Sequence, residues 1–130
     1  MIGGICLAAG VLAATLPLSS FTLAWTHSIE KIRWEEDYRV AGTRLVLEEA
    51  RIKGSGAGME PPADARLENG VWHYMPKLAP LEKLRITQSP YTAGYEICAG
   101  GACKPLTAVL PGLPAIEVVE VRPCQAAQAR

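Results

Sequence analysis

Prolines and glycines interrupt this sequence so often that long helices are not expected. Ten prolines and twelve glycines occur among the 130 residues, and no segment between them has a long, clean helical period. Between these breaks, apolar and polar residues tend to alternate, which is typical of short strands. The sequence therefore predicts an all-β fold of about eight to ten short strands, arranged as an antiparallel β-sandwich or a partly closed barrel.

Chain length and charge limit the classes of protein to consider. A chain of 130 residues is long enough for one hydrophobic core, because a domain of this size buries about two-thirds of its unfolded surface. We expect one domain over residues 1–124 and a frayed tail over residues 125–130, which has nothing to bury. The 13 basic residues balance the 13 acidic ones, so no overall field attracts nucleic acid and we expect none as a partner.

Residues 1–18 are mostly apolar, and the chain has no charged side chain before Glu30. A secretory signal would begin with a positive charge, which is missing here. A membrane-spanning helix needs about 20 apolar residues in a row, and glycines and Pro17 interrupt this segment. We favour an apolar hairpin of the domain, turning at Ala9-Gly10, over a signal or anchor segment.

The positions of the four cysteines suggest two disulfides. A two-residue turn at Gly100-Gly101 would place Cys98 directly opposite Cys103, at the separation a disulfide requires. Cys6 and Cys124 lie near the two ends of the chain and would meet if the first and last strands are neighbours. A zinc site made of all four is the alternative, although the C-x-x-C spacing typical of such sites is missing. We expect no bound metal or cofactor.

The segment FTLAWTHSIEKIRWEEDYRV, from Phe21 to Val40, is predicted to form a hairpin with one apolar face. Both of its halves alternate between apolar and polar residues, so that His27 and Glu36 fall on the core side. The apolar residues predicted to share this face are Phe21, Leu23, Trp25, Ile29, Ile32, Trp34, Tyr38 and Val40.

Two hairpin registers bring His27 close to Glu36. A four-residue loop over residues 30–33 would place His27 opposite Glu36 and Trp25 opposite Tyr38, whereas a two-residue loop would make His27 and Glu36 diagonal neighbours. A buried carboxylate without a partner would cost several kcal/mol, so Glu36 should be paired or neutral. His27 is the candidate partner of Glu36.

Further strands are predicted along the rest of the chain. The segment RLENGVWHYM predicts a hairpin, because Asn69-Gly70 suits a type I′ turn. His73 in this hairpin is expected to point away from the core. The other predicted strands are Arg44–Lys53, Leu81–Gln88, Ala93–Ala99, Ala102–Val109 and Ile116–Val121.

The segment GSGAGMEPP over residues 54–62 is predicted to be a loop. Its glycines, Gly54, Gly56 and Gly58, suggest a phosphate-binding loop, but no Gly-Lys-Ser/Thr follows and prolines replace the expected helix. We interpret them as tight turns that need positive φ angles. Met59 at the end of this glycine loop could border a ligand pocket.

Three motifs resemble a known family. FTLAWTHSIEKIRWEEDY, RIKGSGAGM and SPYTAGYEIC are similar to the bacterial family called domain of unknown function 1850. That family has no established activity. Its members are often encoded beside membrane subunits of TAXI-type TRAP (tripartite, periplasmic-binding-protein-dependent) transporters, so the resemblance implies a transport-associated role in the cell envelope.

Three interpretations of His27 and Glu36 remain open. They form a structural pair that fixes strand register, or the floor of a ligand pocket walled by Trp25, Tyr38 and Met59, or a catalytic or metal site. A nucleophile formed by Ser28 and His27 is excluded, because adjacent residues of a strand point to opposite faces.

Two classes of function follow. The first is a non-enzymatic accessory or binding domain of the periplasm or cell envelope, whose partner is a TRAP transporter membrane subunit or a small ligand. The second is a small-molecule enzyme or metal-dependent binder that uses His27 and Glu36. A cytoplasmic location is the alternative to the envelope, since four unpaired thiols are also compatible with the cytosol.

Overall fold

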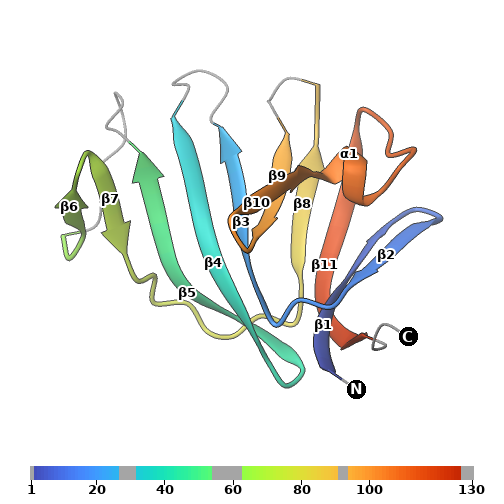
Figure 1. Ribbon diagram of the computed structural model, residues 1–130, viewed down its shortest axis with the longest axis horizontal. Helices are drawn as coiled ribbons and strands as arrows, with labels where there is room; N and C mark the ends of the chain where they lie inside the picture. Colours follow the sequence, from blue (N-terminus) through green and yellow to red (C-terminus); the bar gives the residue numbers. More distant parts are fainter. Residues whose placement is uncertain (1, 27–31, 54–62, 91–93, 127–130) are drawn as a thin grey trace.

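The computed structural model describes residues 2–26, 32–53, 63–90 and 94–126. Two antiparallel sheets of these residues pack as a β-sandwich and do not close into a barrel, which confirms the all-β prediction (Figure 1). The four-stranded sheet has the order β2-β1-β11-β8 and the seven-stranded sheet the order β10-β9-β3-β4-β5-β7-β6. The described elements are β1 (Ile2–Ala9), β2 (Leu12–Leu16), β3 (Ser20–Thr26), β4 (Arg33–Ala41), β5 (Arg44–Lys53), β6 (Arg66–Glu68), β7 (Val71–Tyr74), β8 (Leu84–Gln88), β9 (Tyr95–Ala99), β10 (Ala102–Pro105), α1 (Leu106–Val109) and β11 (Glu117–Ala126).

The core lies between the two sheets and is made of alternate residues from each strand. Side chains of β1 and β11 meet side chains of β3, β4 and β5, and apolar burial of this kind provides most of the folding free energy. Figure 1 shows that β7 and β6, at the left, extend beyond the strands of the four-stranded sheet, at the right. The core cluster is Ile5, Leu7, Ala9, Phe21, Leu23, Tyr38, Leu45, Leu47, Ile86, Ile97, Leu106, Leu110, Val119 and Val121.

Tight turns set the register of two predicted hairpins. Asn69 and Gly70 have φ angles of 51° and 78°, as a type I′ turn requires, and Glu68 pairs with Val71. At Gly100-Gly101 both φ angles are also positive, and Cys98 lies directly opposite Cys103. Both hairpins were predicted correctly.

Both predicted disulfides are present. Cys98 is bonded to Cys103 within the β9–β10 hairpin, and Cys6 is bonded to Cys124 across β1 and β11. In the register of these two strands Cys6 faces Arg122, so Cys124 is its diagonal neighbour. Because these two disulfides use all four cysteines, none of the cysteines is available as a zinc ligand.

The apolar hairpin at the start of the chain forms as predicted, with its loop one residue later. β1 and β2 pair so that Ala9 faces Leu12, which leaves Gly10 and Val11 as the loop. Ala9 is buried in the core and Val11 is fully exposed, so burial decides which residues turn.

Three predicted strand boundaries were wrong. The segment Ala102–Val109 forms β10 and then a single helical turn, because Leu106 and Leu110 both enter the core from it and residues four apart share one helix face. β8 begins at Leu84, and Leu81 makes only an isolated bridge to Leu45.

The third wrong boundary is the end of the last strand. β11 continues to Ala126, because its final residues pair with the first residues of β1. Residues 125 and 126 are therefore not frayed, and residues 127–130 lie outside the described part of the chain.

Candidate functional site

Glu36 is a carboxylate set among aromatic side chains on the inner face of β4. Its Oε1 accepts a hydrogen bond of 2.9 Å from the hydroxyl of Tyr38. Burial raises the pKa of Glu36, and the hydrogen bond from Tyr38 opposes part of that rise. Among the residues that the structure describes, Glu36 has no cationic partner. Within the described part of the chain, this acidic group therefore lacks the positive charge that usually accompanies a buried one.

The charge of Glu36 also acts on three tyrosines. Burial raises the pKa of Tyr38, Tyr74 and Tyr95, and the nearby Glu36 carboxylate raises each of them further. Their hydroxyl groups therefore keep their protons at neutral pH and can donate hydrogen bonds.

A row of aromatic residues crosses the sheet next to Glu36. The register pairs Tyr95 with Trp25, Trp25 with Trp34, Trp34 with Ile52 and Ile52 with Trp72. Because paired residues share a face, four aromatic side chains and Ile52 form one band across the sheet, near the end of β3 and the start of β4. We call it the aromatic row.

Ring contacts join three members of the aromatic row, Trp25, Trp34 and Tyr95. The rings of Trp25 and Trp34 stack with centroids 6.0 Å apart, and those of Trp25 and Tyr95 lie 5.4 Å apart, within the range of favourable aromatic pairs. The indole Nε1 of Trp34 is buried and has no hydrogen-bond partner within the described residues. The aromatic row therefore contains one indole N–H that no described residue accepts.

Glu36 belongs to the neighbouring row of the same face. This row runs through Leu23, Glu36, Ala50 and Tyr74. The small side chain of Ala50 separates the carboxylate from Tyr74. Leu23 and Ala50 are buried, whereas Glu36 and Tyr74 are partly exposed, so the carboxylate lies where the core meets solvent.

Both predicted registers of the β3–β4 hairpin were wrong. Trp25 faces Trp34, Leu23 faces Glu36 and Phe21 faces Tyr38, which is a shift of two residues from one prediction and four from the other. Tyr38 therefore stacks on Phe21, with ring centroids 5.5 Å apart. The faces were predicted correctly, since an even shift leaves every side chain on its own side.

Several predicted site residues lie outside the described part of the chain. These are His27, Ser28 and Met59, with the glycine loop containing Gly54, Gly56 and Gly58. The predicted pairing of His27 with Glu36 therefore stays a prediction. Of the five pocket candidates, the structure describes Trp25, Glu36 and Tyr38, and it places all three on one face.

The sequence did not reveal an ionic network on the opposite face of the same strands. Arg51 on β5 donates two hydrogen bonds to Asp37, of 2.6 and 2.7 Å, and a third of 3.0 Å to Glu35. Arg33 donates to Glu35 over 2.9 Å, and Thr22 donates to Asp37 over 2.6 Å. Alternation predicted that Arg33, Glu35 and Asp37 face outward, but the network also needs the β4–β5 register, which shifts at a β-bulge between Asp37 and Tyr38 that alternation does not predict.

His73 points away from the core, as predicted, and has a carboxylate partner. Its Nδ1 lies 2.5 Å from Oε1 of Glu49 on β5. No group of three or more His, Cys, Asp or Glu side chains within the described residues is arranged to hold a metal ion.

Comparison with known proteins identifies a family and no solved fold. Residues 21–106 match the family model described as Domain of unknown function (DUF1850). No curated protein matches the chain, and no solved structure does. The matched residues include all but the first residue of the seven-stranded sheet, together with Glu36 and the aromatic row. The match extends over more than half of the sequence, so the chain belongs to the domain of unknown function 1850 family.

Proposed function

We propose that this protein is a non-enzymatic binding domain of the bacterial cell envelope, accessory to TAXI-type TRAP solute transport, and that Glu36 and the aromatic row form its ligand site. One observation carries the ligand site. A partly buried carboxylate lies beside the aromatic row, and among the described residues its only hydrogen-bond partner is the Tyr38 hydroxyl.

The chemistry of this site suits a compact, positively charged ligand group. A carboxylate with a raised pKa gains from a cation that replaces its lost hydration. Aromatic faces attract organic cations through their quadrupoles, by about 0.5 to 2 kcal/mol for each contact. The members of the aromatic row are partly exposed apart from Ile52, which is buried, so a ligand could approach the rings.

The envelope location rests on the disulfides and on the family. Structural disulfides are typical of oxidising compartments such as the bacterial periplasm, and this chain bonds all four of its cysteines. The resemblance of its motifs to the family implies the association with TRAP transporters. None of the described helices has the length and apolar character needed to cross a membrane.

A pair of isosteric probes tests the ligand site. Choline and its neutral analogue 3,3-dimethylbutan-1-ol have the same shape and differ in charge. We expect choline to change the tryptophan fluorescence of the wild-type protein, and we expect the neutral analogue to have a much smaller effect. Glu36→Gln should remove this difference, whereas Glu48→Gln, at an exposed position of β5, should retain it. Equal binding of both probes would contradict the proposal.

Covalent capture tests the accessory role. The protein would be exported to the periplasm together with a TAXI-type TRAP membrane subunit, and a photo-crosslinker would be placed at exposed positions of β6. We expect a specific adduct with that subunit. A disulfide-bonded envelope protein of similar size serves as the control bait, and an equal yield from both baits would count against the accessory role.

A further inference from the structure

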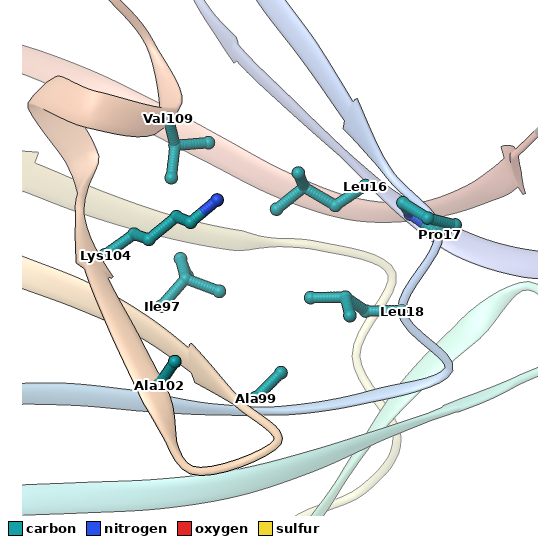
Figure 2. A pocket seen from close by; sticks show the side chains of 8 residues that line it. All are labelled: Leu16, Pro17, Leu18, Ile97, Ala99, Ala102, Lys104 and Val109. Carbon is teal, nitrogen blue, oxygen red and sulfur yellow. The ribbon is translucent and has the colours of Figure 1, made fainter. Parts of the chain in front are cut away.

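An apolar pocket lies at the β9–β10 edge of the seven-stranded sheet, and its lining does not include Glu36. It has a volume of about 220 Å³ and lies between the β2–β3 connection, the β9–β10 hairpin and α1 (Figure 2). Seven of its eight lining residues are apolar. The lining consists of Leu16, Pro17, Leu18, Ile97, Ala99, Ala102, Lys104 and Val109. We call it the Lys104 pocket.

Lys104 is the only charged residue in this lining. Figure 2 shows its side chain reaching over the pocket, with Nζ between Val109 and Leu16. No carboxylate of the described residues lies within ion-pair distance of this ammonium group. An apolar cavity with one unpaired cation at its rim therefore offers complementary surface to an amphiphilic anion.

The β9–β10 hairpin supplies half of the lining from a single face. Ala99 pairs with Ala102, and Ile97 pairs with Lys104, so these four side chains point the same way. The Cys98–Cys103 disulfide lies on the opposite face of the hairpin, where the Arg33 guanidinium is 3.8 Å from Sγ of Cys103. The disulfide thus fixes this wall without occupying the cavity.

We propose that the Lys104 pocket binds a small amphiphilic monoanion, consisting of a short acyl chain that ends in a carboxylate. The chain would fill the apolar cavity, and the carboxylate would pair with the ammonium group of Lys104. A volume of about 220 Å³ is that of about seven water molecules in the liquid. One methylene group of the chain needs about as much volume as one of these water molecules. The site is independent of Glu36 and requires no cation.

The competing explanation is that Lys104 only covers apolar surface. Lysine often lays its aliphatic stem along apolar side chains and keeps its charge in water. In that case neither the charge of a ligand nor its chain length would matter, and this difference is the basis of the test.

A series of carboxylates measures both properties. Calorimetric titrations would compare butanoate, hexanoate, octanoate and decanoate below their micelle concentrations. Affinity should rise by up to about fourfold for each added methylene and should level off at about seven or eight carbons, where the cavity is full. Octan-1-ol should bind more weakly than octanoate. Affinity that continues to rise with chain length, or equal affinity for the alcohol, would overturn the proposal.

Two variants place the binding at this pocket. Lys104→Met keeps the aliphatic stem and removes the charge, so it should weaken octanoate by about threefold to fivefold and leave octan-1-ol unchanged. Ala102→Leu fills the cavity from an exposed position and should abolish both. The matched controls are Lys77→Met and Ala13→Leu, at exposed positions outside the lining, and they should bind like the wild type.

Three further measurements test whether octanoate binds in the Lys104 pocket. Glu36→Gln should leave octanoate binding unchanged, so failure at one site is distinguishable from failure at the other. Methyl signals of Ile97 and Val109 should shift during the titration, because both side chains line the pocket. Binding to vesicles of anionic lipid without binding of free octanoate would overturn the proposal, as would an equal loss of affinity in Lys104→Met and Lys77→Met.

Discussion

Glu36 and Asp37 are adjacent on β4 but have opposite electrostatic surroundings. Burial raises the pKa of Glu36 on the inner face. On the outer face, hydrogen bonds from Arg51 hold the pKa of Asp37 below its ordinary value, with a smaller contribution from Thr22. A raised carboxyl pKa means that the ionised form costs stability, whereas a lowered one means that it contributes stability.

Glu36→Gln should therefore stabilise the fold at neutral pH. The amide avoids the burial of a charge and can still accept the hydrogen bond from Tyr38, so the free energy of unfolding should rise by up to about 1 kcal/mol. Because the pKa of Glu36 is raised on folding, its protonated form contributes stability to the wild type at low pH. This contribution is lost as pH rises through the folded pKa, so the stability advantage of the variant should grow from about pH 4 to pH 7. Urea unfolding at several pH values measures it, with Glu48→Gln as the control. A loss of stability at pH 7 would instead indicate a cationic partner such as the predicted His27.

Asp37→Asn should have the opposite dependence on pH. Asp37 stabilises the fold above its unfolded pKa, and this contribution is lost as pH falls through the lower folded pKa. We expect the variant to lose about 1 kcal/mol at pH 7 and the difference from the wild type to shrink below about pH 4. Urea unfolding from pH 7 to pH 3 would measure it, and a difference that does not vary with pH would contradict this assignment.

At the scale of elements, turns decided how much of the pairing could be predicted. Cys98 and Cys103 were matched correctly because Gly100-Gly101 allows one tight turn, and a two-residue turn sets the register of its hairpin. The β3–β4 hairpin has no such signal. Its alternation shows which side each residue faces, but it is unchanged by an even shift. In the observed register Trp25 stacks on Trp34. The two-residue period of the sequence does not indicate which residues of the two strands face each other, so it could not predict this contact.

The short helix was missed for a related reason. Alternation through Ala102–Val109 was read as a single strand, whereas Leu106 and Leu110 both enter the core and lie four residues apart, as one helical turn requires. The backbone N–H of Leu110 donates to the carbonyl of Leu106 over 2.7 Å. Tertiary packing thus determined the local structure of a segment too short for its own pattern to do so.

The guanidinium of Arg51 joins β5 to β4 through two hydrogen bonds to one carboxylate. Lysine cannot reproduce this geometry, so Arg51→Lys should lower the free energy of unfolding by about 1 kcal/mol. Arg39 pairs with Glu48 across the same two strands, but both side chains are about half exposed. Arg39→Lys should therefore cost at most a few tenths of a kcal/mol, about what exposed ion pairs contribute. Equal losses in urea unfolding would show that the Arg51 network has no special weight.

At the scale of the molecule, the two sheets have different origins in the sequence. The family match over residues 21–106 includes nearly all of the seven-stranded sheet. Three of the four strands in the other sheet, β1, β2 and β11, lie outside the match, and β1 pairs with β11 near the two ends of the chain. The four-stranded sheet therefore depends on the pairing of β1 with β11, which are far apart in the sequence. The Cys6–Cys124 disulfide joins these two strands covalently.

The two disulfides should therefore differ in their effect on stability. Cys6 and Cys124 are 118 residues apart, whereas Cys98 and Cys103 are five apart. In the chain-entropy account, a cross-link stabilises by restricting the unfolded chain, by about 5 kcal/mol for the long loop and about 2 kcal/mol for the short one. Two variants would each have both cysteines of one pair replaced by serine. Urea unfolding should show a larger loss of unfolding free energy for the Cys6–Cys124 variant than for the Cys98–Cys103 variant. The slope of the transition should rise more in the long-loop variant, because its unfolded chain exposes more surface. A larger loss from the Cys98–Cys103 pair would mean that the hairpin wall of the Lys104 pocket, and not the joined ends of the chain, limits the stability of the sandwich.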